Sequence, residues 1–157
     1  MIPIQDLKLV ALLRTNARGK LTAISRKICM PVSTIFEKLK KYEGKIFKKY
    51  VVLVDFSQFG YVIRANICLR VAKEHKEGIM NYLKSHQNVN SLLRINNGFD
   101  YMVEAYFEEL KGVEEFIEIL ESRFKIEEKQ IFYILDDIIQ ESFMSKPEMC
   151  DILSQPS

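Results

Sequence analysis

The first third of the chain carries apolar residues at helical spacing. Leucine and isoleucine recur three and four positions apart over residues 4–13, 21–28 and 35–42, which is the period of an amphipathic helix. Pro31 separates the second run from the third, because the residue before a proline disfavours the helical conformation. The pattern therefore predicts three short helices with a tight turn between the last two, which is a helix-turn-helix.

The pattern changes to that of strands after this point. β-branched and aromatic residues favour strands, and we expect them over residues 50–54, 62–71, 89–95, 99–107 and 129–139. Asn97-Gly98 joins the third and fourth of these and is the strongest short-range signal for a hairpin. Residues 74–85 and 110–124 return to helical spacing. From residue 62 onward the order is β-α-β-β-α-β, the ferredoxin-like arrangement, so the fold class is α+β.

Charge divides the chain in the same place as the hydrophobic pattern. Residues 1–50 hold 12 lysines and arginines against three acidic residues, a net charge of +9. The remaining residues hold 11 basic and 18 acidic residues, a net charge of −7, although the whole chain is only +2. This asymmetry indicates two units with different partners. The basic unit suits a polyanion such as double-stranded DNA, which would repel the acidic one.

Composition excludes several other classes of protein. No window approaches the ~20 consecutive apolar residues of a membrane span, and the N-terminus lacks the order of a secretory signal. Cys29, Cys68 and Cys150 are too few and too widely spaced for a disulfide framework or a zinc site. We therefore expect a cytoplasmic protein with no membrane partner, no metal, no cofactor and no catalytic residues.

Six short motifs in a fixed order resemble the Lrp/AsnC (feast/famine) family of transcription regulators. The match spans about residues 4–140 and rests on Asp6 to Leu13 with Asn16-Ala17-Arg18, Leu21 to Ser25, Glu37 to Glu43, Ile46 to Asp55 with Phe59-Gly60-Tyr61, Phe99-Asp100-Tyr101, and Ile134 to Ile138. The resemblance implies a winged-type helix-turn-helix over 1–50, a linking strand over 51–60 and a ligand-binding, oligomerising βαββαβ domain over 61–140. A weakly patterned tail, 141–157, would follow.

The third predicted helix carries the candidate DNA-binding residues. Its buried stripe is Ile35, Leu39 and Tyr42, and the resemblance implies that the opposite face enters the major groove of DNA. The candidates are Ser33, Thr34, Glu37, Lys38, Lys40, Lys41 and, just after the helix, Lys45 and Lys48. We expect Ser33 and Thr34 to reach base edges while Lys40 and Lys41 grip phosphates. The alternative is an ordinary solvated, lysine-rich face.

The family pattern is broken just before this helix. Cys29-Met30-Pro31 stand where the family usually has Gly-Leu-Ser. The helix is therefore expected to have its N-cap at Ser33, or to begin with Pro31 as its first helical residue.

The hairpin turn carries the candidate effector-binding residues. In the resembled family this loop lies between dimers and receives a small effector, usually an amino acid. If the resemblance carries over, Asp100 would hold an α-ammonium group and exposed backbone N–H groups near Asn96, Asn97 and Gly98 a carboxylate. Tyr133 could line the same pocket. The alternative is a plain turn in which Asp100 acts as a cap.

Two other functions share this architecture. Siroheme decarboxylases use histidines as acid–base groups, and His75 and His86 are the histidines of this chain. An assembly module that binds a ligand but no DNA would make the basic N-terminal charge incidental.

We favour a DNA-binding regulator. We expect it to form a homodimer or higher oligomer, because one face of the predicted sheet needs a cover beyond its own two helices.

Overall fold

The computed structural model describes residues 2–150 and divides into two compact units. The first, here called the helical unit, combines Met1–Val52 with Ile138–Ser157. The second, the sheet unit, is Leu53–Asp137. The division near residue 52 follows the change in hydrophobic pattern, whereas the return of the chain's end to the first unit is not visible in the pattern.

The helical unit contains the expected helices, α1 (Ile4–Thr15), α2 (Leu21–Ile28) and α3 (Val32–Tyr42). Their apolar stripes meet in one small core formed by Leu9, Leu13, Ile24, Ile28, Met30 and Ile35. The turn between α2 and α3 passes through Cys29, whose φ of 51° is left-handed and ends α2. The predicted helix-turn-helix is therefore confirmed.

The N-cap of α3 differs from both sequence-based alternatives. Pro31 itself is the N-cap, with extended backbone angles, and its carbonyl accepts the N–H of Ile35 at 3.0 Å. The proline ring fixes φ near the required value without any capping side chain. Ser33 therefore lies inside the first turn and keeps its hydroxyl free of a capping role.

The predicted linking strand is wrong. Within the described chain, residues 48–55 form no strand, and the preceding segment is a tight turn closed by an isolated bridge between Glu43 and Phe47. A short 3-10 helix, η1 (Phe56–Phe59), leads into the sheet. The β-branched residues Val51, Val52 and Val54 favour extended backbone, but no strand among residues 2–150 pairs with them, and all three are exposed.

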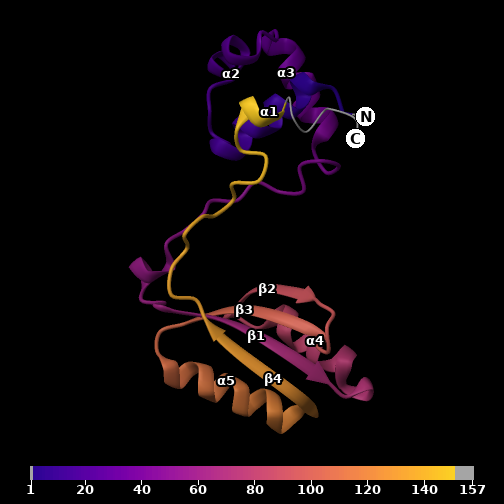
Figure 1. Ribbon diagram of the computed structural model, residues 1–157, viewed down its shortest axis with the longest axis vertical. Helices are drawn as coiled ribbons and strands as arrows, with labels where there is room; N and C mark the ends of the chain where they lie inside the picture. The colour runs from indigo at the N-terminus through magenta and orange to yellow at the C-terminus, as the bar shows by residue number, and fades with distance from the viewer. Residues whose placement is uncertain (1, 151–157) are drawn as a thin grey trace. The chain divides into compact units, whose positions relative to one another are not determined.

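The sheet unit is a four-stranded antiparallel sheet in the order β2-β3-β1-β4. The strands are β1 (Ile63–Val71), β2 (Val89–Arg94), β3 (Tyr101–Phe107) and β4 (Ile126–Tyr133). The helices α4 (Lys76–Ser85) and α5 (Leu110–Arg123) lie together on one face of this sheet (Figure 1). This is the predicted ferredoxin-like fold.

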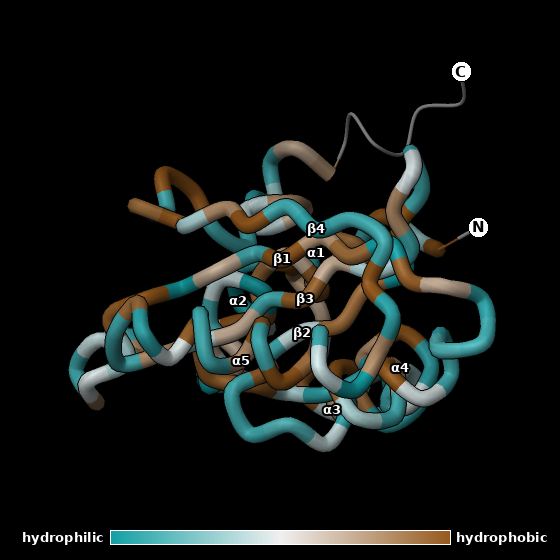
Figure 2. The backbone as a smooth tube through the Cα atoms, turned by 90° about the horizontal axis from the view of Figure 1, so that it is seen from below, coloured by the Kyte–Doolittle hydropathy of each residue, from teal (hydrophilic) through white to brown (hydrophobic). Residues whose placement is uncertain are grey.

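Alternation along the central strands separates a buried face from an open face. Along β3 every second residue from Tyr101 to Phe107 is buried. Figure 2 colours the backbone by the hydropathy of each residue. Ile67, Leu69 and Val103 are fully buried beneath the helices, against Ile79 and Leu120. The intervening residues of both strands point to the other face, as the pleat requires.

The hairpin between β2 and β3 is built as its sequence predicts. Asn97 and Gly98 have φ values of 64° and 89°, the left-handed pair that a tight two-residue turn requires. The Ile95 N–H donates to the Asp100 carbonyl at 3.1 Å and closes the loop.

The last strand begins and ends earlier than predicted. β4 pairs with β1 from Val71 opposite Ile126 to Ala65 opposite Tyr133. Because β1 itself begins at Ile63, residues 135–139 have no partner strand in the part of the chain that the structure describes. Their apolar pattern is left exposed, with Leu135 and Ile138 both 95% accessible.

The end of the described chain packs on α1, beside which it is drawn in yellow (Figure 1). Arg14 donates to the Phe143 carbonyl at 2.7 Å and forms a 2.7 Å ion pair with Glu141. The Thr15 hydroxyl donates to the Ser145 carbonyl at 2.7 Å, and Cys150 is fully buried. The expected tail over 141–157 is thus part of the helical unit as far as residue 150; residues 151–157 lie outside the described chain.

Among residues 2–150, no helix is long and apolar enough to cross a bilayer.

Candidate nucleic-acid interface

The outward face of α3 presents polar and basic side chains. Ser33, Glu37, Lys40 and Lys41 are exposed, while Thr34 is half-buried at the edge of this face. Ile35 is fully buried on the opposite side of the helix. Within the described chain, neither Lys40 nor Lys41 forms an ion pair. Their charges are therefore available to an external anion.

A buried carboxylate holds α3 against α1. Asp6, only 1% exposed, accepts a short hydrogen bond from the Tyr42 hydroxyl and forms a 2.8 Å ion pair with Lys38. The hydrogen bond to Asp6, together with burial and the nearby negative charge, raises the pKa of Tyr42 to about 12. This cluster fixes the angle at which α3 presents its outward face.

Lys38 consequently does not belong to the outward face. Its ammonium group is directed to Asp6 on α1, and its side chain is only 26% exposed. The structure therefore separates Lys38 from the other candidate DNA-binding residues. A partner 32 positions earlier in the chain left no local signal in the sequence.

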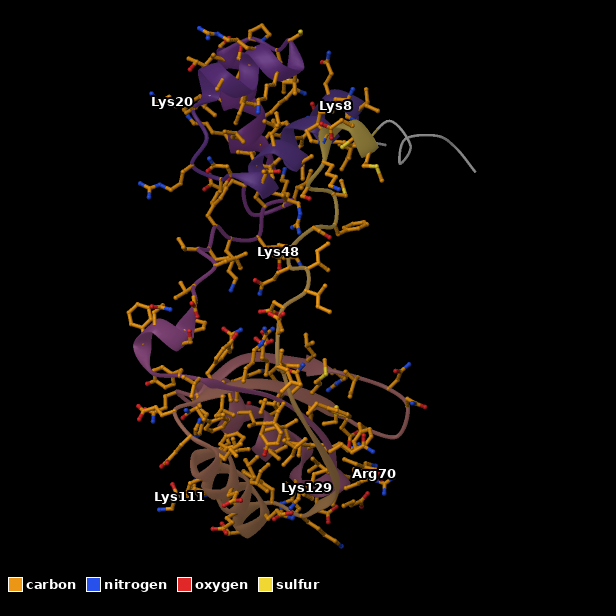
Figure 3. The ribbon with its side chains drawn as sticks, turned by 60° about the vertical axis from the view of Figure 1, so that its left-hand side comes forward. Lys8, Lys20, Lys48, Arg70, Lys111 and Lys129 are labelled. Atoms are coloured by element: carbon orange, nitrogen blue, oxygen red, sulfur yellow. The ribbon has the colours of Figure 1, made fainter. Side chains whose placement is uncertain are left out.

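Further bases flank the helix-turn-helix. Lys45, Lys48 and Lys49 follow α3 and are exposed, although the segment that carries them forms a turn and extended chain instead of a β-wing. Arg18, Lys20, Arg26 and Lys27 are exposed around α2. Lys20 and Lys48 are labelled in Figure 3. Together these bases add exposed positive charge to the helix-turn-helix that contains α3.

Sequence reasoning missed two apolar residues on the same helix. Val32 is 39% exposed and Phe36 is 49% exposed, one turn apart. The Lys40 ammonium nitrogen lies 4.6 Å from the centre of the Phe36 ring. The available signal was the spacing of Phe36, which lies ~60° around the helix from Leu39, the nearest member of the buried stripe. Val32 continues that stripe three positions before Ile35, so its spacing gave no sign of exposure.

The candidate effector residues lie at one end of the sheet. Asn96, Asn97 and Gly98 are exposed in the hairpin turn. Both oxygens of the Asp100 carboxylate are engaged, one accepting the Val71 N–H at 2.9 Å and the other pairing with Lys76. Burial raises the pKa of Asp100, but the hydrogen bonds from Lys76 and Val71 outweigh it and hold that pKa below its ordinary value.

Tyr133 is not brought to this loop within one subunit. It pairs with Ala65, whereas Asp100 contacts β1 at Leu69 and Val71. Six residues of strand at ~3.3 Å each separate the two ends by roughly 20 Å. A pocket containing both residues would need Tyr133 from a second copy of the chain.

The two histidines serve packing in the sheet unit. His75 lies edge-on to Phe124, and His86 lies 4.8 Å from the Phe116 ring. Burial lowers the pKa of His86. His86 also lines a cavity of about 360 Å³ beside Asn88 and Glu109, at the end of the β2–β3 hairpin opposite the turn. Among residues 2–150, no cluster of histidine, cysteine and acidic side chains could hold a metal ion.

Sequence relatives that cover nearly all of the chain are regulatory proteins, among them helix-turn-helix transcriptional regulators. The glutamate uptake regulatory protein of Zymomonas mobilis is 20% identical over 150 residues, 93% of this chain and 92% of its own length. An uncharacterised helix-turn-helix transcriptional regulator of Pyrococcus furiosus is 22% identical over 143 residues, 90% of this chain and 96% of its own. No protein-family model matches the chain.

Solved structures with the same fold are also regulators. A transcriptional regulator of Neisseria meningitidis in complex with L-methionine superposes with a TM-score of 0.81 at 21% identity, covering 89% of this chain and 94% of that one. LrpC of Bacillus subtilis gives a TM-score of 0.76 at 22% identity, covering 88% and 97%. These proteins give no support to the siroheme-decarboxylase alternative. The chain has the fold of the Lrp/AsnC family of transcription regulators, a helix-turn-helix joined to a ferredoxin-like domain.

Proposed function

We propose that this protein is a cytoplasmic, sequence-specific regulator of transcription that binds double-stranded DNA through α3. One observation carries the proposal: the outward face of α3 combines short polar side chains with Lys40 and Lys41, which make no ion pair in the described chain. The net charge of +9 in residues 1–50 supports the same conclusion, as do relatives that are transcription regulators.

The candidate DNA-binding residues fall into two groups, those that can reach base edges and those that can reach phosphates. Ser33 and Thr34 lie in the first turn of α3, where short hydroxyl side chains can reach base edges once the helix enters the major groove. Lys40 and Lys41 lie in its last turn, with Lys45 and Lys48 beyond it, where ammonium groups would meet the phosphate backbone. Glu37 stands between these groups and would accept a hydrogen bond from a cytosine amino group.

A footprint on the DNA upstream of the protein's own gene tests this function. The wild-type full chain should protect a discrete segment at a concentration where a Lys40→Ala/Lys41→Ala variant protects none. Lys73→Ala/Lys84→Ala, which removes two exposed lysines of the sheet unit, is the matched control and should protect the same segment. Failure of the wild type to bind any duplex at low salt would contradict the proposal.

We infer that the functional form is a homodimer or higher oligomer. Two recognition helices must lie ~34 Å apart to enter successive major grooves, and the open face of the sheet is available to a second copy. Phe132 of β4, 52% exposed, lies on that face. Light scattering should give at least a dimer for the wild type and a smaller mass for Phe132→Glu. A monomeric wild type would contradict the inference.

We also propose an amino-acid effector at the hairpin turn of residues 96–100. The exposed Asn96, Asn97 and Gly98 offer polar groups next to the Asp100 carboxylate. The complex of the Neisseria regulator with L-methionine supports this ligand class. Because Asp100 already pairs with Lys76, a bound ammonium group would have to share this carboxylate with Lys76.

Calorimetry with each of the twenty amino acids tests the effector. At least one should give heat with the wild type and none with Asp100→Asn, while Asp55→Asn, at an exposed aspartate before η1, should behave as the wild type. Near-ultraviolet circular dichroism would establish that Asp100→Asn keeps its fold. If no amino acid gives heat with the wild type, the hairpin is a turn and nothing more.

A further inference from the structure

Val32 and Phe36 form a small apolar patch on one side of α3, between its buried stripe and its outward face. Phe36 leaves 49% of its surface accessible and Val32 leaves 39%, on a helix of which the other side fills the core with Ile35. Exposure of an aromatic ring costs free energy that burial would recover. Because the patch adjoins the polar face that we propose for DNA, the same partner can cover both.

The patch is continuous with the candidate base-reading residues. At ~100° per residue, Phe36 lies ~40° around the helix from Val32 and ~60° from Ser33. Lys40 extends along the same side and places its ammonium nitrogen 4.6 Å from the Phe36 ring. The Phe36 ring is therefore held beside a cation, with its remaining surface directed outward.

The charge around the patch decides what can cover it. Lys40 borders it, Lys41 lies farther around the same helix, and Arg26 and Lys27 of the preceding helix are exposed. A hydrophobic partner that tolerates this many unneutralised cations must itself carry dense negative charge. The major groove of DNA meets both requirements, since each thymine presents a C5-methyl group between two phosphate backbones, and phenylalanine is among the side chains that contact that methyl.

We propose that Phe36, supported by Val32, reads the methyl group of a thymine in each half-site of the operator. This inference rests on the proposed function and adds a base-specific contact to it. Lys40 would neutralise phosphate in this arrangement, from a position beside the Phe36 ring. Ser33, one position after Val32, would then read a neighbouring base pair.

Replacing thymine with deoxyuridine tests the contact, since this change removes only the methyl group. A preferred duplex is first selected from a random library with the wild-type full chain, and each thymine is then replaced in turn. Burial of one methyl group contributes about 0.8 kcal/mol, so we expect one position per half-site to bind about fourfold more weakly with uracil. Equal affinity for thymine and uracil at every position would overturn the inference.

The variants assign the discrimination to its side chain. Phe36→Ala should bind thymine and uracil duplexes equally while keeping the wild-type dependence on salt, because no charge is removed. Lys40→Gln should lower the salt dependence and keep the preference for thymine. Thymine discrimination that survives in Phe36→Ala would overturn the inference.

Two further outcomes separate this inference from the proposed function. If the wild type selects no duplex, the proposed function itself fails. If the wild type binds duplex without a preference for thymine, and Phe36→Ala has a smaller mass than the wild type in light scattering, the patch is an interface between copies of the chain. That result would overturn the thymine contact and leave DNA binding intact.

Discussion

The two units of the chain differ in which of their lysines and arginines form ion pairs within the protein. In the sheet unit five of the ten lysines and arginines form ion pairs: Arg64 with Glu104 and Asp137, Arg70 with Glu127 and Glu128, Lys76 with Asp100, Lys111 with Glu115, and Lys129 with Glu121. Figure 3 labels three of these cations, Arg70, Lys111 and Lys129. In the helical unit Arg14 and Lys38 pair, whereas the bases of α2 and the outward face of α3 form no ion pair in the described chain.

Cations that form ion pairs within the chain stabilise the fold, whereas cations without such a pair are available to a binding partner. Where a cation of the helical unit is paired, it fixes an element: Lys38 joins α3 to α1, and Arg14 joins the C-terminal segment to α1. A cation that is already neutralised releases few counterions on meeting DNA, whereas an unneutralised one contributes fully. The bases that remain around α3 are therefore the ones to test.

Reversing the charge on α3 should have the largest effect. We expect Lys40→Glu/Lys41→Glu to weaken binding to any duplex by more than about 100-fold, because two phosphate contacts become repulsive. Fluorescence anisotropy with a labelled duplex measures it. Lys73→Glu/Lys84→Glu changes the net charge equally on the sheet unit and should cost far less; an equal loss in both variants would mean that net charge, and not this face, governs binding.

Removing the Tyr42 hydroxyl should destabilise the helical unit next most strongly. Tyr42→Phe leaves the buried Asp6 carboxylate with one donor fewer, which we expect to cost about 1–3 kcal/mol in the free energy of unfolding. Urea denaturation followed by circular dichroism measures it. Tyr50→Phe, at a tyrosine that is 53% exposed, is the control and should change little.

We also expect the stability of the wild type and of Tyr42→Phe to depend differently on pH in the alkaline range. Because the pKa of Tyr42 is raised from 10.0 to about 12 in the folded chain, its contribution is complete below pH 10. Between these pH values the unfolded state loses the proton first, so stability falls as pH rises. Tyr42→Phe should lack this part of the decline, and a parallel decline in wild type and variant would contradict the assigned cause.

Deleting the C-terminal segment should have a smaller effect, confined to the helical unit. Ending the chain at Gln140 removes the contacts of Arg14 with Phe143 and Glu141 and uncovers the surface buried by Cys150. We expect a loss of about 1–2 kcal/mol. Hydrogen exchange of the α1 amides should accelerate while that of β1 is unchanged, and unaltered α1 protection would show that the segment contributes nothing.

Breaking an exposed ion pair of the sheet unit should have the smallest effect. Arg70 and its partner Glu128 are each more than two-fifths exposed, so solvent screens their attraction. Arg70→Gln should change the free energy of unfolding by less than about 1 kcal/mol and leave duplex affinity unchanged. A marked loss of DNA binding would place part of the interface on the sheet unit.

Local signals explain what the sequence predicted well. The apolar stripes of α1 to α3, the alternation in β1 and β3, and the Asn97-Gly98 turn each depend on residues close in the chain. Features that depend on distant partners were missed. The linking strand over 51–60 finds no neighbouring strand among residues 2–150, and β4 could not continue beyond the start of β1.

In the candidate site, too, local sequence patterns predicted some features, whereas features that depend on distant residues were missed. The exposed positions of Ser33, Lys40 and Lys41 follow from helical periodicity alone. The assignment of Lys38 to Asp6, and of Asp100 to Lys76 and Val71, depends on contacts across 24 to 32 residues that no local pattern reveals. Phe36 was overlooked because apolar residues are expected inside, and only the fold shows which ones are left outside.

The salt dependence of duplex binding tests the central claim most directly. Anisotropy with a random-sequence duplex, recorded as sodium chloride is raised from low concentration, gives the slope of log affinity against log salt. At about 0.9 for each phosphate neutralised, the wild type should have a steep negative slope, and Lys40→Gln/Lys41→Gln should reduce its magnitude by about 1.8. The same slope in both proteins would contradict the claim that the unpaired cations of α3 meet the DNA backbone.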